Sequence, residues 1–299
     1  MGEFLEHEKN RQVLFLRESG YFSLNLSTFT ENPQRLPAGI ASENLCPAIR
    51  LRAIDYFEIN HIHWPRGNFY SPSPDLCDVT VNCVNYFFPF SNSPTALRNL
   101  LSLVYPTIKN MLPFPDGSYV AFLWPEADQE QCADAAVYFL RKDFSKQLVL
   151  INWNYCETYS QNPLVADQKL EQLFDYNLPI NTEKLNKLDP LLYQPFYRYL
   201  QLQILASQLE LERYLENDLV TVLNVMPFKN KDLLKVVSPE LTQFGLSPSQ
   251  VWQNLVKPYD RFATVFTENL FGHFDISHHP ELLEWWLYIT RRYPWLNNK

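Results

Sequence analysis

Three short apolar runs between residues 118 and 155 restrict the fold of this chain more strongly than any other feature of its sequence. They are SYVAFLW (118–124), DAAVYFL (134–140) and QLVLINWNY (147–155). Each run has the length and the β-branched and aromatic composition of a strand, and polar or acidic connections separate the runs. The sequence therefore predicts a β-meander in the middle of the chain.

Helical periodicity lies on both sides of these runs. Apolar residues at four-residue spacing (Leu45, Ile49, Ala53, Phe57) predict an amphipathic helix over 41–60, opened by Ser42 and Pro47. Apolar stripes predict two more helices, from Pro94 to about Met111 and from Asp189 to about Glu216, and then a strand at 218–226. The remainder reads as helix, strand, helix. The predicted fold class is α/β, with helices around one mixed sheet.

Composition and charge limit the function classes. With 299 residues, 46% of them hydrophobic, the chain can bury a core without disulfides or metals, and its five widely spaced cysteines suit reduced thiols in a cytosol. The N-terminus is charged and no apolar run is long enough for a membrane span, so we expect a cytoplasmic protein with no membrane partner. A net charge of −8 disfavours DNA as a partner unless a local basic groove binds it.

Two amides mark the third apolar run. Because strand side chains alternate, Asn152 and Asn154 point to the same face, together with Leu148 and Leu150. The opposite face carries Val149, Ile151, Trp153 and Tyr155. If the second and third runs pair as neighbours, Asp134 at the start of the second run lies close to both amides.

An acidic residue that begins one strand, followed by two polar residues at alternate positions of the next, resembles the motif layout of the PD-(D/E)XK nuclease superfamily. Colinear segments over most of residues 40–270, among them ENLCPAIRLRAIDYFEINHIHW and ADAAVYFLRKDFSKQLVLINWNYCETY, resemble a bacterial restriction-endonuclease-like family of that superfamily. The resemblance implies an αβββαβ core with a central mixed sheet, flanked by helices and supplemented by additional ones. The expected organisation is an N-terminal extension (1–40), the nuclease-like domain (41–270) and a C-terminal helix (271–299) that packs on the domain or on a partner.

The resemblance also assigns roles to the motif positions. Asp134 keeps the carboxylate that holds Mg²⁺ in such nucleases, whereas Asn152 stands in the place of the Glu and Asn154 in the place of the Lys. An amide carries no charge and is a poor substitute for either group. We therefore expect a degenerate site with no cofactor, and Mg²⁺ at Asp134 only if activity is retained. Two further carboxylates are candidates, Glu157 by relocation and Glu43 from the first helix.

Other polar groups have a functional and an ordinary interpretation. Lys142 or Lys146 could replace the missing cation, and the acidic residues Glu126, Asp128 and Glu130 could gather Mg²⁺, but exposed charge at strand ends and in loops explains both groups. Four histidines could ligate a metal, but they lack Cys or Asp at ligand spacing, so we expect loop histidines; they are His61, His63, His278 and His279.

Three functions follow from these observations. The first is a degenerate nuclease-like protein that acts by binding, as a regulatory or assembly factor that contacts another protein. The second is an active Mg²⁺-dependent DNA endonuclease with relocated catalytic residues, and the third is a nucleic-acid-binding module that does not cleave. A C-terminal aromatic block is a candidate interface, with a partner protein or in a homo-oligomer; it contains Trp285, Trp286, Trp295, Arg291 and Arg292.

Overall fold

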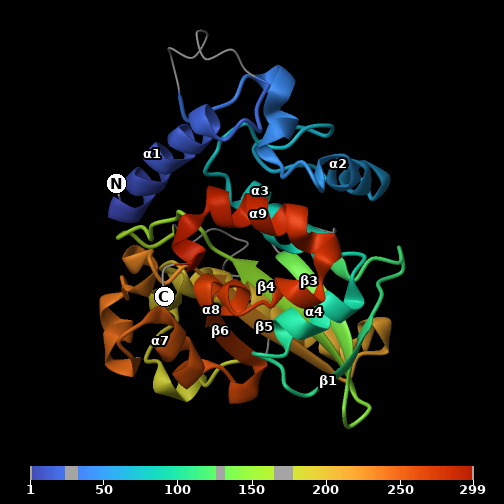
Figure 1. Cartoon of the computed structure of the whole chain (residues 1–299). Coiled ribbons are helices and arrows are strands. Elements are labelled where there is room, and N and C mark those ends of the chain that lie inside the picture. Colours follow the sequence, from blue (N-terminus) through green and yellow to red (C-terminus); the bar gives the residue numbers. More distant parts are fainter. Residues whose placement is uncertain (1, 24–32, 126–131, 165–177, 298–299) are drawn as a thin grey trace.

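A mixed sheet of six strands forms the centre of the described part of the chain (Figure 1). The computed structural model describes residues 2–23, 33–125, 132–164 and 178–297. The strands are β1 (Ile108–Leu112), β2 (Val120–Trp124), β3 (Ala133–Arg141), β4 (Lys146–Trp153), β5 (Leu219–Met226) and β6 (Phe262–Phe266). The expected α/β class with one mixed sheet is confirmed.

The sheet has an antiparallel half and a parallel half. Strands β2, β3 and β4 pair antiparallel in chain order, which confirms the predicted meander. Strand β1 pairs with β3 on the same edge as β2, further along the strand. Strands β4, β5 and β6 are parallel, so their carboxyl ends share one edge of the sheet. Helix α6 (Phe196–Leu211) lies in the crossover from β4 to β5.

Helices cover both faces of the sheet and create two cores. On one face lie α3 (Val79–Phe87), α4 (Pro94–Leu101), α8 (Thr267–Gly272) and α9 (Leu283–Arg292), with α1 (Glu3–Glu18) and α2 (Arg50–Ile59) outside them (Figure 1). On the other face lie α6 and α7 (Pro248–Leu255). Val149, Ile151 and Trp153 join the first core, while Leu148 and Leu150 join the second, so the predicted alternation along β4 is confirmed.

Prolines shorten three predicted helices. The helix expected over 41–60 is a 3₁₀ turn (Ala38–Asn44) followed by α2, because Pro47 restricts the backbone between them. The helix expected to reach Met111 ends at Leu101, and Pro106 precedes β1. The helix expected from Asp189 begins as α6 at Phe196, directly after Pro195. The buried stripes themselves are predicted correctly, since Leu45, Ile49, Ala53 and Phe57 are all buried.

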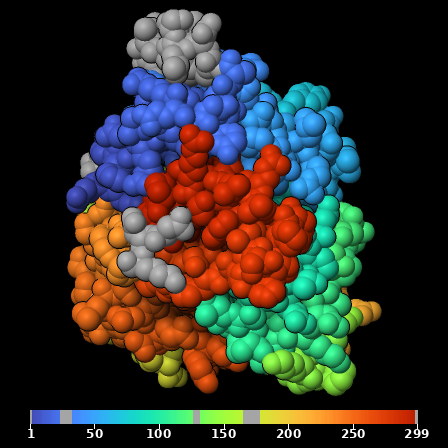
Figure 2. Space-filling view, in the orientation of Figure 1, coloured from blue at the N-terminus to red at the C-terminus, as the bar shows by residue number. Residues whose placement is uncertain are grey.

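Most of the C-terminal aromatic block is internal, although α9 keeps an exposed face that includes Leu283, Leu287 and Arg291. Trp285, Trp295 and Arg292 are buried, and Trp286 is half-buried. The guanidinium of Arg292 donates to the backbone oxygen of Asn44 at 2.6 Å and to Gln12 Oε1 at 2.8 Å, so it joins α9 to the N-terminal layer. Figure 2 shows the red C-terminal residues set between the blue N-terminal layer and the rest of the molecule. These buried groups are not free to form an interface.

Candidate functional site

The pairing of β3 with β4 brings Asp134 to the end of β4. Ala135 is the register partner of Ile151, which sets Asp134 beside the residues that follow Ile151. The backbone N–H of Trp153 donates to Asp134 Oδ2 at 2.8 Å. The predicted neighbourhood of the two strands is therefore confirmed, and the Asp134 carboxylate lies on the edge of the sheet where β4 ends.

A cation from α6 lies between Asp134 and Asn152. Arg198 Nη2 is 3.7 Å from Asp134 Oδ2, and Arg198 Nε donates to Asn152 Oδ1 at 3.3 Å. Arg198 Nη2 also donates to the backbone oxygen of Cys132 at 2.6 Å, which fixes the guanidinium plane. Phe196 and Tyr199 anchor this end of α6 in the second core. Arg198 is not among the site residues predicted from the sequence, although it is the one cationic residue of α6.

The two amides converge on a third amide from β5. Asn152 and Asn224 are register partners, and Asn152 Nδ2 donates to Asn224 Oδ1 at 2.8 Å. Asn154 Nδ2 donates to the same oxygen at 2.9 Å and also lies 3.2 Å from the backbone oxygen of Val225. Asn224 is not among the site residues predicted from the sequence, although it is the lone amide in the predicted strand DLVTVLNVM. We call Asp134, Asn152, Asn154, Arg198 and Asn224 the motif cluster.

The motif cluster is nearly closed to water. Exposure is 4% for Asn152, 8% for Asn154 and zero for Asn224, whereas the Asp134 side chain keeps 22%. Burial raises the pKa of Asp134 above its ordinary value, while the charge of Arg198 and the Trp153 N–H act in the opposite direction. The cluster is thus a mostly buried polar network in which one carboxylate faces one guanidinium.

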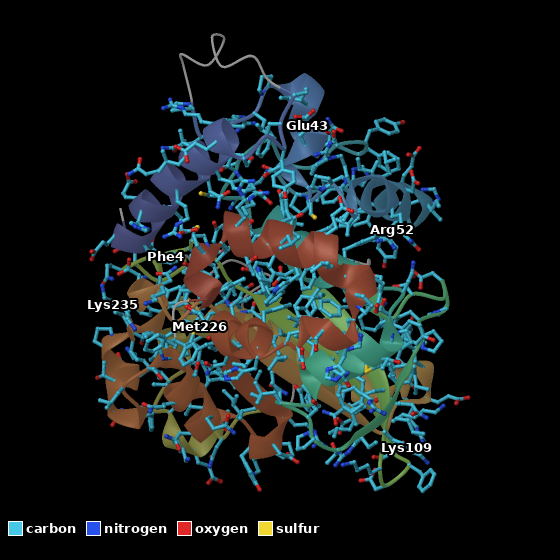
Figure 3. The ribbon with its side chains drawn as sticks, in the orientation of Figure 1. Phe4, Glu43, Arg52, Lys109, Met226 and Lys235 are labelled. Atoms are coloured by element: carbon cyan, nitrogen blue, oxygen red, sulfur yellow. The ribbon has the colours of Figure 1, made fainter. Side chains whose placement is uncertain are left out.

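Glu157 lies beyond the end of β4, and its carboxylate turns back to accept the backbone N–H of Tyr155 at 2.6 Å. Burial raises its pKa to about 7, the Tyr155 hydrogen bond opposes this, and the negative charge of Asp134 raises it further. Glu157 and Asp134 are therefore within electrostatic reach of each other. Glu43 is apart from this group: it accepts two hydrogen bonds from Ser23, and Figure 3 places it in the N-terminal layer.

The proposed substitute cations lie at the wrong end of the strands. Lys146 begins β4 and pairs with Glu216 at 2.5 Å, and Lys142 is in the β3–β4 turn. At about 3.3 Å per residue, Lys146 is roughly 20 Å along the strand from Asn152. Neither lysine can act on the Asp134 carboxylate, so the alternative of a substitute cation is excluded for both, in agreement with the interpretation as ordinary charge at strand ends.

The histidines do not gather around a common point. His61 and His63 are exposed, His278 pairs with Asp275 at 2.9 Å, and the ring of His279 lies 3.0 Å from the Asn99 amide. Among the residues that the structure describes, no three His, Cys, Asp or Glu side chains come together in an arrangement suited to a metal ion. The acidic residues Glu126, Asp128 and Glu130 lie outside the described residues.

The motif cluster does not fit a magnesium ion. Mg²⁺ requires several oxygen ligands, usually including carboxylates, in octahedral geometry. Asp134 supplies one carboxylate, but Arg198 already compensates its charge, and the Asn152 amide oxygen accepts from the same guanidinium. A cation of the protein therefore lies where a bound metal ion would need open oxygen ligands.

Comparison of the chain with protein-family models, with curated proteins and with solved structures finds no match. None of the helices in the described ranges combines the length and the apolar character that crossing a lipid bilayer requires.

Proposed function

We propose that this chain is a PD-(D/E)XK nuclease-like protein that has lost the chemistry of that superfamily and acts by binding, as a regulatory or assembly factor that contacts another protein. The antiparallel β2–β3–β4 unit, the α6 crossover and the parallel strand β5 are compatible with the core that the resemblance implies. Asp134 on β3 lies beside the end of β4 that carries Asn152, and this proximity supports the proposal.

The contacts of Arg198 are the main evidence for the proposal that catalysis is lost. Its guanidinium contacts both Asp134 and Asn152, and Asn224 binds the amide of Asn154 as well as that of Asn152. A hydrolytic site needs exposed groups that bind a metal ion and a phosphate. Here the same positions bind one another, so the polar residues stabilise the fold and leave binding as the remaining activity.

A cleavage assay tests the loss of chemistry. Purified protein is incubated with single- and double-stranded DNA in Mg²⁺ or Mn²⁺, and we expect no nicking above a buffer control. Metal-dependent nicking that disappears in Asp134→Ala would contradict the proposal.

A rebuilding experiment tests the assignment of each motif position. Asn152→Glu with Asn154→Lys restores the residue types of the motif, and Arg198→Ser removes the competing cation. The triple variant should bind Mn²⁺ in calorimetry, because two carboxylates then share the site and Arg198 no longer pairs with Asp134. The double variant that keeps Arg198 is the matched control and should bind Mn²⁺ more weakly. The assignment fails if the triple variant melts like the parent and binds no more Mn²⁺ than the parent does.

The binding activity itself is tested by affinity capture from native cytosol, followed by reconstitution with purified components. We expect a protein that copurifies in a fixed ratio and rebinds in isolation. Recovery of nucleic acid alone would instead support the non-cleaving nucleic-acid-binding module.

One observation favours the second candidate function, a Mg²⁺-dependent endonuclease with relocated residues. Asp134 and Glu157 accept the backbone N–H groups of Trp153 and Tyr155, which are two residues apart at the end of β4, so two carboxyl groups lie at this edge of the sheet. Under this alternative, Glu157→Gln and Asp134→Asn would each abolish the same nicking activity, whereas under the main proposal there is no activity for either variant to remove.

A further inference from the structure

A cavity of about 610 Å³ lies between the start of α1 and the segment that follows β5. Figure 3 places Phe4 and Lys235, one from each wall, close together at the left edge of the molecule. A second hollow of about 230 Å³ shares Gly2, Asp232 and Lys235 with it and extends toward Thr158. The combined size is that of a small-molecule site. The lining comprises Gly2, Glu3, Phe4, His7, Arg11, Lys229, Lys231, Asp232, Lys235 and Trp295, and we call it the basic pocket.

One wall of the basic pocket is a segment held in a fixed conformation. The backbone N–H groups of Phe228 and Lys229 donate to the carboxylate of Glu268 at 2.8 and 3.1 Å. The buried Asn230 side chain donates to the backbone oxygens of Tyr155 and Glu157 at 3.0 and 2.9 Å. Lysine side chains at 229, 231 and 235 therefore project from a backbone that is already ordered, which lowers the entropic cost of binding a ligand.

The other wall is α1, which is anchored in the core. Glu8 is fully buried and accepts from Tyr155 Oη at 2.8 Å and from Trp295 Nε1 at 3.2 Å. The same carboxylate holds Arg11 Nε at 3.0 Å, so the guanidinium has a fixed position in the pocket lining. Phe4 packs edge-on against Tyr155 and Trp295 and supplies an apolar part of the lining.

Positive charge is in excess in this pocket, although the chain as a whole carries −8. Four permanently cationic side chains line it against two carboxylates, Glu3 and Asp232, and one of the four, Arg11, is already paired with the buried Glu8. Lys235 pairs with Asp232 at 2.5 Å, whereas no described carboxylate forms an ion pair with Lys229 or Lys231. The Lys231 ammonium lies 3.2 Å from the centre of the Phe228 ring. Two ammonium groups thus remain available to an anion.

A carboxylate of the chain already lies at this positive position. A side chain on Gly2 would collide with Asp232 Oδ2, so that oxygen lies against the first residue before α1. The N-terminus of a helix carries a partial positive charge, and Gly2 offers no side chain to cap it. Asp232 is therefore held between the helix N-terminus and Lys235, and it competes with any other anion that enters the pocket.

We propose that the basic pocket binds an organic phosphate of the size of a mononucleotide. A phosphate monoester carries nearly two negative charges and three acceptor oxygens, which suits several cations on two facing walls. The volume leaves room for the organic part beside Phe4 and Trp295, and Glu3 can accept hydrogen bonds from its hydroxyl or amino groups. This proposal does not depend on the nuclease resemblance, because none of its residues belongs to the motif cluster.

Calorimetric titration of the full chain with adenosine monophosphate tests the proposal, at an ionic strength of roughly 50 mM so that screening stays weak. We expect saturable one-to-one binding. Lys229→Ala with Lys231→Ala should weaken it about tenfold, because two attractive charges are lost. Asp232→Asn should tighten it about threefold, because a competing carboxylate is removed. Lys109→Ala is the matched control, since Lys109 is on β1 at the other end of the molecule, and it should change nothing (Figure 3).

The opposite signs of the two pocket variants separate ligand binding from a loss of folding, which would weaken binding in both. Weaker saturable binding of inorganic phosphate, with the same response to both variants, would support recognition through the phosphate group. The proposal is overturned if adenosine binds as tightly as its monophosphate, if only oligonucleotides bind, or if neither phosphate compound binds above the level of the lysine double variant.

Discussion

The motif cluster and the basic pocket both lie at the edge of the sheet where β4 and β5 end. They differ in whether their charged side chains have partners within the protein. In the motif cluster, Arg198 compensates Asp134, and Asn224 binds the two strand amides. In the basic pocket, Lys229 and Lys231 have no carboxylate partner among the described residues. A buried polar group without a hydrogen-bond partner destabilises the fold. An exposed charge is solvated by water and needs no partner in the protein, so it stays available to a ligand. Under the two proposals, the motif cluster therefore serves stability and the pocket serves binding.

Breaking the motif cluster at Asn224 should have the largest effect on stability. Asn224→Leu removes the acceptor that Asn152 and Asn154 share and leaves buried amide groups without that partner. We expect a loss of about 3 kcal/mol in the free energy of unfolding, measured by urea denaturation. Asn269→Leu on the exposed face of α8 is the control and should change stability by less than about 0.5 kcal/mol. Equal stability of both variants would mean that the amide network contributes nothing.

Removal of Arg198 should have the next largest effect. Arg198→Met leaves the Asp134 carboxylate without its cation, at a cost of about 2 kcal/mol, reduced from the fully buried case because both side chains keep some exposure. The cost should shrink as the pH falls and Asp134 becomes protonated, since a neutral carboxyl group needs no cation. Asp134→Asn in the same chain should recover part of the loss. Arg213→Met, at an exposed ion pair with Asp218, is the control. A loss that is independent of pH would contradict the electrostatic role.

Glu157 should shape the dependence of stability on pH. Its folded-state pKa of about 7 lies above the ordinary value, so the folded state holds the proton more tightly than the unfolded chain. The protein should therefore lose stability as the pH rises from about 4.5 to about 7, and remain level above that. Glu157→Gln removes this loss and should be more stable than the parent above pH 7 by about 1 kcal/mol, after allowance for partial exposure. Parallel pH profiles for the two proteins would refute this.

The sheet could be predicted because the period of two is a strong signal over a whole strand. Alternation along β4 placed Ile151 and Trp153 in one core and Leu148 and Leu150 in the other, as the structure has them. Helix ends were predicted poorly, because an apolar stripe can continue past a proline into another element, as it does from α4 to β1. Helix α3 was missed, because its β-branched residues favour a strand while Asp78 caps it as a helix.

Only those residues of the candidate site that lie on two consecutive strands of the sequence could be predicted. Asp134 and Asn152 are close in sequence, and their relation follows from one antiparallel pair. Arg198 and Asn224 come from the crossover helix and from the next strand, so their contacts require the register of β4 with β5 and the rotation of α6. No local pattern encodes that geometry. The basic pocket was missed for the same reason, since α1 and the segment after β5 are more than 200 residues apart.

Substitutions in the basic pocket should have the smallest effect on stability in the absence of ligand. Their effect should instead be seen in how far a ligand raises the melting temperature. Lys229→Ala with Lys231→Ala relieves repulsion between like charges but loses the contact of Lys231 with Phe228, so we expect a change within about 0.5 kcal/mol. A ligand that binds only the folded state raises its stability in proportion to the logarithm of its concentration over Kd. Adenosine monophosphate should therefore raise the melting temperature of the parent and of Asp232→Asn, with much less effect on the lysine double variant. If the double variant is strongly destabilised without ligand, the lysines belong to the structural network and the contrast with the motif cluster fails.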